Sequence, residues 1–177
     1  TPTYNEQADF RFRWTHNQDA KSHPYRNFSA NVNLVSSTFN QYAVSTSDYF
    51  NNTTTSSIAF STRFGQKVSF TANLGEVYTA NTGAISLDLP SISISTSQFY
   101  PFRRKQMKGN ARWYEDISIS YRTSLANSIN TYDSLLLTKE IVKYMKNGMH
   151  HSIPIQSNVK VFKHLNWTNS INYNERW

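Results

Sequence analysis

The dominant pattern along the chain is an alternation of apolar and polar side chains. Phe10, Phe12 and Trp14, for example, interleave with Arg11 and Arg13. Successive residues of a β-strand point to opposite faces, so each such segment has one apolar and one polar side. The alternation predicts antiparallel strands over eight segments, namely 7–16, 27–37, 55–64, 67–76, 83–98, 113–128, 151–162 and 165–177.

The fifth predicted strand changes face at Pro90. Its apolar residues are odd-numbered up to Leu89 and even-numbered from Ile92 onward. A hairpin at Pro90 would add a strand, whereas a β-bulge inserts one residue into a single strand and shifts the parity. The bulge is the preferred interpretation, because it leaves the short turns at 64–67 and 162–165 at the same end of the sheet.

Long connections are expected at 38–52 and 131–150, between the short turns. Outer-membrane barrels have short turns on the periplasmic side and long loops outside. Within the second long connection, Asp133 or Ser134 provides a cap, Leu136, Ile141, Val142 and Met145 follow with helical spacing, and Gly148 closes the segment. We therefore expect one short amphipathic helix over 133–148, in an outer loop.

The composition changes the picture from a soluble sheet to a membrane barrel. Of the 177 residues, 38% are hydrophobic, 15% aromatic and only 16% charged. Disordered chains are poor in aromatics and rich in charge, so disorder is excluded. The polar faces carry Ser, Thr and Asn, and aromatic pairs stand near strand ends at 49–50, 99–100 and 113–114, where interfacial girdles belong. The fold class predicted is an all-β, antiparallel up-and-down transmembrane barrel.

The predicted strands account for about eight strands of a larger barrel. No apolar run is long enough for a membrane-spanning helix, and no signal peptide is visible at Thr1. We expect the 177 residues to be part of a single barrel domain in the bacterial outer membrane, crossing it many times, within a longer protein.

Charged residues within the strands indicate which face is wet. An Arg facing lipid at mid-membrane costs about 2–4 kcal/mol, whereas in a wet lumen it costs little. The candidates for the lumen lining are Arg11, Arg13, Asn31, Asn33, Arg63, Asn73, Arg122 and Lys160. The candidates for the lipid-facing side are Phe10, Phe12, Trp14, Phe60, Phe70, Ile119, Tyr121 and Trp167.

The net charge of +7 is concentrated in three basic clusters, Lys21–Arg26, Arg103–Lys108 and Lys139–Lys146. All three fall in predicted connections, so solvated loops are the plain interpretation and lipid head-group phosphates the sharper one. Nucleic acid is not an expected partner. No catalytic motif accompanies the serines, and neighbouring His150 and His151 would point to opposite faces of a strand. We expect no enzyme, no metal site and no cofactor.

Six segments, taken in order, are similar to one known family. They are 28–34, 87–94, 100–105, 113–117, 147–154 and 172–177, which read FSANVNL, LDLPSISI, YPFRRK, WYEDI, NGMHHSIP and NYNERW. Together they resemble the lipopolysaccharide-assembly outer-membrane family LptD, in the form found in Bacteroidetes. The resemblance implies a barrel that inserts lipopolysaccharide into the outer leaflet. It also implies membrane lipid, an LptE-like lipoprotein plug and periplasmic bridge proteins as partners.

Two alternatives remain open from the sequence. Another outer-membrane barrel, such as a porin or a nutrient receptor, would keep the fold and change the substrate. A soluble β-sandwich that binds carbohydrate through exposed aromatics would show similar alternation.

Overall fold

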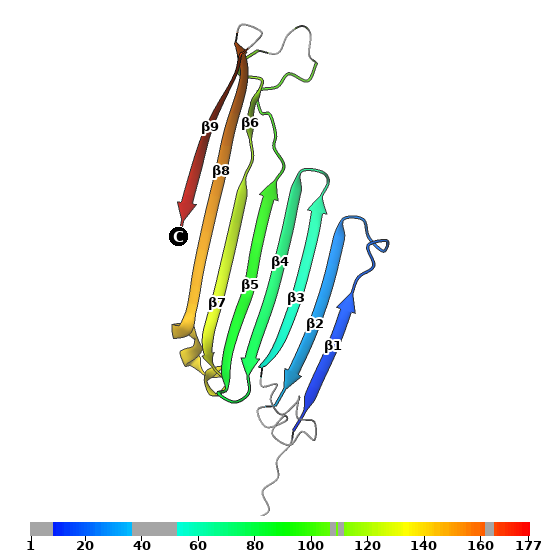
Figure 1. Ribbon diagram of the computed structural model, residues 1–177, viewed down its shortest axis with the longest axis vertical. Coiled ribbons are helices and arrows are strands. Elements are labelled where there is room, and N and C mark those ends of the chain that lie inside the picture. The colour runs from blue at the N-terminus through cyan, green and yellow to red at the C-terminus, as the bar shows by residue number, and fades with distance from the viewer. Residues whose placement is uncertain (1–8, 37–52, 107–108, 110–111, 162–164) are drawn as a thin grey trace, which may run out of the picture.

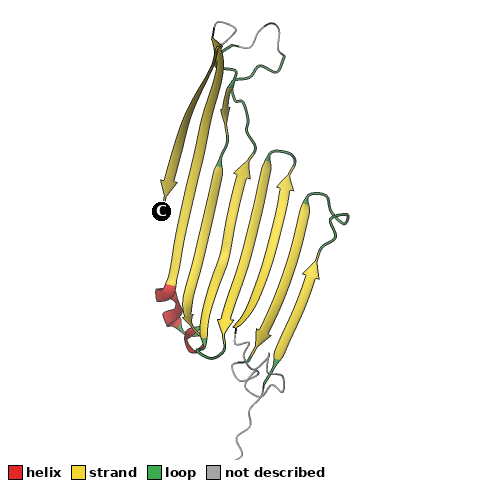
Figure 2. Ribbon diagram, in the orientation of Figure 1, coloured by secondary structure: helices red, strands yellow, loops and turns green. Residues whose placement is uncertain are grey.

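The computed structural model describes residues 9–36, 53–106, 109, 112–161 and 165–177. Within these residues the chain is all-β, and its nine strands form one antiparallel up-and-down sheet (Figures 1 and 2). The strands are β1 (Arg11–Asn17), β2 (Arg26–Val35), β3 (Thr53–Phe64), β4 (Val68–Thr79), β5 (Ala84–Thr96), β6 (Ile117–Ile119), β7 (Arg122–Tyr132), β8 (Met145–Val161) and β9 (Leu165–Arg176). Among the described residues, no helix is long and apolar enough to cross a membrane.

Strands β6 and β7 together occupy one position in the sheet. Both pair with β8 in the same register, so they are two parts of one strand with a gap at residues 120–121. Pro154 of β8 lies opposite this gap and accepts a bond from the Ser120 amide, but as a proline it has no N–H to donate in return. The missing ladder bond explains why the strand is interrupted there.

Strand β5 is continuous through Pro90 and carries a β-bulge. The register shifts by one residue against β4, between Asn73 and Gly75, and it shifts again against β7 between Asp88 and Ile92. The extra residue moves the apolar positions from odd to even numbers, which is the parity change seen in the sequence. The Asn127 side chain of β7 donates to the Pro90 carbonyl at 3.5 Å.

The strands are staggered along the sheet (Figure 1). A row of cross-strand partners that starts at Arg26, the first residue of β2, runs through Thr62 and Thr123 and ends at Glu175, next to the end of β9. The row therefore starts at the first residue of β2 but crosses β8 at His151, in the interior of that strand. Stagger of this kind is what a sheet needs to close into a tilted barrel.

The two short turns expected from the sequence, at 64–67 and 162–165, lie at the same end of the sheet, whereas the short β4–β5 turn at 80–83 lies at the opposite end. Phe64 pairs with Val68 around a turn in which Gly65 has a φ of 61°, a left-handed conformation that glycine adopts freely. Val161 pairs with Leu165 at the same end (Figure 1), although residues 162–164 of the second predicted turn lie outside the described residues. Also outside the described residues are 7–8 and 37–52, and the second range includes the aromatic pair at 49–50.

The prediction of one amphipathic helix over 133–148 is wrong, both in the type of helix and in its length. Two short 3-10 helices occupy the connection, η2 (Asp133–Leu135) and η3 (Lys139–Tyr144), at the end of the sheet opposite the short turns (Figure 2). Strand β8 then begins at Met145 rather than at 151. Met145 follows Ile141 with a spacing that suits a helix, but its backbone pairs with Ile129 of β7 as part of a strand.

The strand expected over 113–128 is displaced. Residues 113–116 form turns, and the strand position is filled by β6 and β7, from Ile117 to Tyr132.

A small buried hydrophobic cluster lies at the end of the sheet where β2 and β4 finish, and it consists of Val35, Tyr78, Ala80 and Ile85. Leu136 of the β7–β8 connection packs against it. This connection therefore folds onto the end of the sheet, against the only buried hydrophobic cluster in the described part of the chain.

Candidate functional site

The register collects polar side chains on one face of the sheet, which we call the polar face. Because cross-strand partners share a face, each row of partners can be followed from strand to strand. One row contains only polar residues, namely Asn27, Ser61, Thr71, Ser93, Ser124, His150 and Arg176. Within it, the hydroxyls of Thr71 and Ser93 lie 2.5 Å apart. The polar face thus presents a near-continuous band of hydroxyls and amides.

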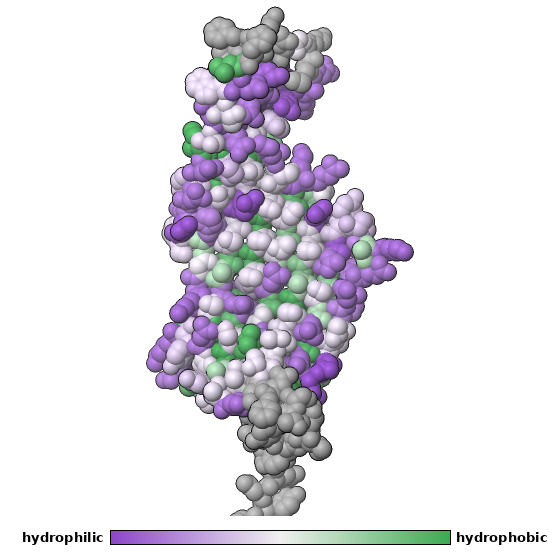
Figure 3. Space-filling model, in the orientation of Figure 1, coloured by the Kyte–Doolittle hydropathy of each residue, from purple (hydrophilic) through white to green (hydrophobic). Residues whose placement is uncertain are grey.

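The opposite side, which we call the apolar face, consists of rows one residue out of step. The row adjacent to the polar one just described contains only apolar residues, Phe28, Phe60, Ala72, Ile92, Leu125 and Met149. Burial differs between the faces along β7, where Thr123, Ile129 and Thr131 of the apolar face are buried while Arg122 and Asn130 are exposed. Figure 3 looks onto one face of the sheet, where hydrophilic and intermediate side chains predominate.

The residues proposed from the sequence for the two sides separate between these faces. All eight lumen candidates, Arg11, Arg13, Asn31, Asn33, Arg63, Asn73, Arg122 and Lys160, lie on the polar face. Of the lipid-facing candidates, Phe12, Trp14, Phe60, Phe70, Ile119 and Trp167 lie on the apolar face. Phe10 and Tyr121 lie just outside the strands. Tyr121 stacks on His151 and shares a 2.7 Å hydrogen bond with its Nδ1.

Charge is distributed unequally between the two faces. The cations of the polar face are Arg11, Arg13, Arg63, Arg122, Lys146, Lys160 and Arg176. Among the described strand residues, Asp88 is the one carboxylate on that face, and Arg26 is the one Lys or Arg on the apolar face. Lys146 and Arg176 were missed as lumen candidates, although the parity of Arg176 with Asn172 could have identified it. The polar face is therefore cationic as well as polar.

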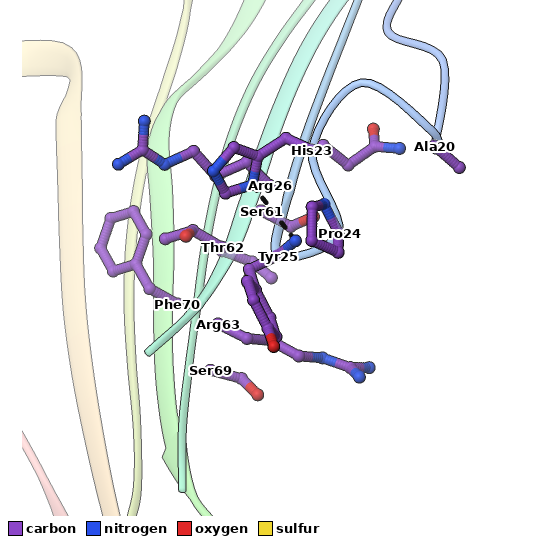
Figure 4. Close-up of a pocket in the computed structure, with 12 residues that line it drawn as sticks. Ala20, His23, Pro24, Tyr25, Arg26, Ser61, Thr62, Arg63, Ser69 and Phe70 are labelled. Carbon is purple, nitrogen blue, oxygen red and sulfur yellow. Dashed lines mark hydrogen bonds between the residues drawn. The ribbon is translucent and has the colours of Figure 1, made fainter. Parts of the chain in front are cut away.

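An open hollow of about 490 Å³ lies where β2 begins and β3 continues beyond it. It is lined by His23, Tyr25, Arg26 and Arg63 among others. Figure 4 shows that the side chains of Arg26 and Arg63 extend in opposite directions, as expected from their places on opposite faces. The two guanidinium groups therefore do not converge on a shared ligand.

The connection between β5 and β6 is held by ion pairs. Glu115 is 0% exposed, and it accepts hydrogen bonds from both the Arg104 side chain and the Arg112 amide. The hydrogen bond from Arg104 holds the pKa of the Glu115 carboxyl below its usual value, and the Arg112 amide lowers it further. Arg103 pairs with Asp116 at 3.3 Å. Two of the segments that resembled a known family, 100–105 and 113–117, therefore meet in this structure.

The histidines do not form a metal site in the described residues, where no group of three metal-binding side chains occurs. His150 pairs with Ser124 and Arg176 on the polar face, whereas His151 pairs with Thr123 and Glu175 on the apolar face. Their side chains are on opposite sides of the sheet.

The fold and the two faces are typical of one class of protein, the membrane β-barrels. The sheet is antiparallel and staggered, with one apolar face and one polar, cationic face. Residues 1–177 match the family model described as LptD protein. The chain therefore belongs to the LptD family, which consists of outer-membrane β-barrel proteins that act in lipopolysaccharide transport and are not enzymes. No curated protein and no solved structure matches the chain.

Proposed function

We propose that this chain forms part of the wall of the outer-membrane barrel that inserts lipopolysaccharide into the outer leaflet. The chain belongs to one barrel domain that crosses the membrane many times. Its apolar face meets membrane lipid, and its polar face lines the lumen. The lumen side chains form hydrogen bonds with sugars and ion pairs with phosphates as the molecule passes.

The distribution of strand charges is the observation that carries this proposal. Seven Lys and Arg residues of the strands lie on the polar face, beside one carboxylate, Asp88. Lipopolysaccharide carries phosphate groups, and guanidinium groups bind phosphates with paired, charge-assisted hydrogen bonds. A lumen that served neutral solutes would not need this excess of positive charge. The charge therefore supports an anionic cargo.

The two alternatives from the sequence lose support for different reasons. The family assignment argues against a porin or a nutrient receptor. A β-sandwich requires two packed sheets, but the described strands form one sheet whose two faces are both free of a second layer. An open face of aromatic and aliphatic side chains is better suited to lipid than to water.

The proposed partners come from the family to which the chain belongs. Lipopolysaccharide is the cargo, and periplasmic bridge proteins of the pathway deliver it to the barrel. An LptE-like lipoprotein occupies the lumen as a plug, in contact with the polar face. Charged and hydroxyl groups on that face provide hydrogen-bonding partners for such a plug as well as for the cargo.

A pair of photo-crosslinking residues tests the proposal. Ala72 and Asn73 are neighbours in β4, so they lie at the same height on the apolar and polar faces respectively. In cells, a photo-crosslinker at position 73 should capture lipopolysaccharide, and one at position 72 should capture phospholipid. The shared height makes position 72 a matched control for depth and for access.

Capture of lipopolysaccharide at both positions in equal amounts would contradict the assignment of the faces. Capture at neither position, with surface lipopolysaccharide unchanged when the protein is depleted, would contradict the transport role itself.

A further inference from the structure

Arg26 departs from the distribution of the strand cations: among the strand residues that the structure describes, it is the one Lys or Arg on the apolar face, which also carries the carboxylates Glu76 and Glu175. Its partner across the ladder is Thr62 of β3, and the same row continues to Phe70 of β4. No carboxylate forms an ion pair with Arg26 within the part of the chain that the structure describes. Its guanidinium group is therefore available to an anion from outside this sheet.

The surroundings of Arg26 are aromatic. Arg26, Phe60, Thr62, Phe64 and Phe70 line a hollow of about 220 Å³. The rings of Phe60 and Phe70 meet edge to face with their centroids 6.3 Å apart. Figure 4 shows the side chains of Arg26 and Phe70 on one side of the sheet and that of Arg63 on the other. A cation thus stands beside an apolar hollow.

The hollow lies at one end of the strands. Arg26 is the first residue of β2, and Phe64 is the last residue of β3 before the short Gly65 turn. In outer-membrane barrels the strand ends mark the boundary of the membrane, where the apolar band gives way to head groups. An Arg at this depth can hold its charged group at head-group level while its stem lies along apolar side chains.

We propose that Arg26 and the hollow beside it bind a membrane phospholipid. The guanidinium group pairs with the lipid phosphate, and the three phenylalanines contact the first part of an acyl chain. The hollow is smaller than the roughly 300–1,000 Å³ of ordinary small-molecule pockets, so it holds a segment of a chain rather than a whole ligand. This inference rests on the proposed lipid contact of the apolar face.

The test uses the intact protein, purified in detergent and incubated with phosphatidylglycerol, with retained lipids counted by native mass spectrometry. Arg26→Gln should weaken retention roughly tenfold, the effect of losing one paired, charge-assisted contact. Arg63→Gln is the matched control, because Arg63 lies at the same end of the strands but on the polar face. Phe64→Ala keeps the charge and should lower retention by a smaller factor.

Four results would overturn the proposal. Retention could be unchanged in Arg26→Gln, or it could fall equally in Arg63→Gln, which would indicate a general charge effect. Inorganic phosphate could also displace the lipid at equal concentration, which would indicate a plain anion site. Loss of a co-purifying protein instead of lipid would assign the hollow to a protein partner.

A separate measurement distinguishes failure of this site from failure of the membrane placement. The chain contains no cysteine, so Ile92→Cys takes a single label in the middle of the apolar face, once any cysteines outside these residues are replaced. Quenching of a bimane label there by lipids with brominated acyl chains supports the membrane placement, whatever the fate of the Arg26 site. Absence of quenching would contradict both.

Discussion

The two faces of the sheet are built from the same strands, yet they present different side chains. The apolar face carries rows such as Phe28, Phe60, Ala72 and Ile92, whereas the neighbouring polar row carries only hydroxyl, amide and basic side chains. Because one residue step separates the rows, the proposed contacts with lipid and with cargo would use alternate positions of each strand. The difference teaches that the consequence of a mutation depends first on which of the two faces carries the mutated residue.

The largest expected effect comes from placing one charge on each face. Ile92→Arg should destabilise the folded barrel by about 2–4 kcal/mol, the cost of an Arg near the middle of the lipid-facing side. Ser93→Arg, its neighbour on the polar face, should cost close to nothing. Urea titration of the protein folded into vesicles measures both. Equal losses in the two variants would show that the two faces do not have different surroundings.

A smaller effect is expected at the interruption between β6 and β7. Pro154→Val supplies the N–H that is missing opposite Ser120, so it should stabilise the sheet by about 0.5–1.5 kcal/mol, the net value of one hydrogen bond. The same titration measures the gain, and hydrogen exchange at residues 119–122 should slow. Ile155→Val, at the next position of β8, is the control. A loss of stability in Pro154→Val would mean that the interruption has another cause.

The smallest global effect concerns the charges that lie outside both faces. The pKa of Glu115 is lowered by Arg104, so its stabilisation is complete above the ordinary pKa of the carboxyl and is lost as pH falls through the lowered value. Limited proteolysis of the β5–β6 connection should therefore accelerate in strong acid while the strands stay intact. Glu115→Gln should give the same acceleration at neutral pH. Asp116→Asn, at the more exposed ion pair, should change it less.

Much of this arrangement can be predicted from the sequence, because parity is a local property. The side of each lumen candidate and the position of the bulge at Pro90 follow from which apolar residues are odd and which are even. Arg26 could have been placed on the apolar face in the same way, since it shares its parity with Phe28. It was assigned to a connection because it closes a basic cluster that begins at Lys21.

Other features depend on partners that are distant in the sequence. Glu115 and Arg104 meet only because β5 and β6 position the two ends of their connection, so nothing local predicts the burial of Glu115. The start of β8 was missed because Met145 continues the helical spacing of Ile141 and Val142. What decides between the two structures is the ladder with β7, in which Met145 pairs with Ile129.

The stagger of the strands has a consequence for anything that moves along the polar face. Each row of partners climbs the wall as it passes from strand to strand, from the start of β2 to the end of β9. A sugar that exchanges one hydroxyl for the next along such a row would move along the strands and around the barrel at the same time. The ratio of the two movements is set by the hydrogen-bond register of the strands.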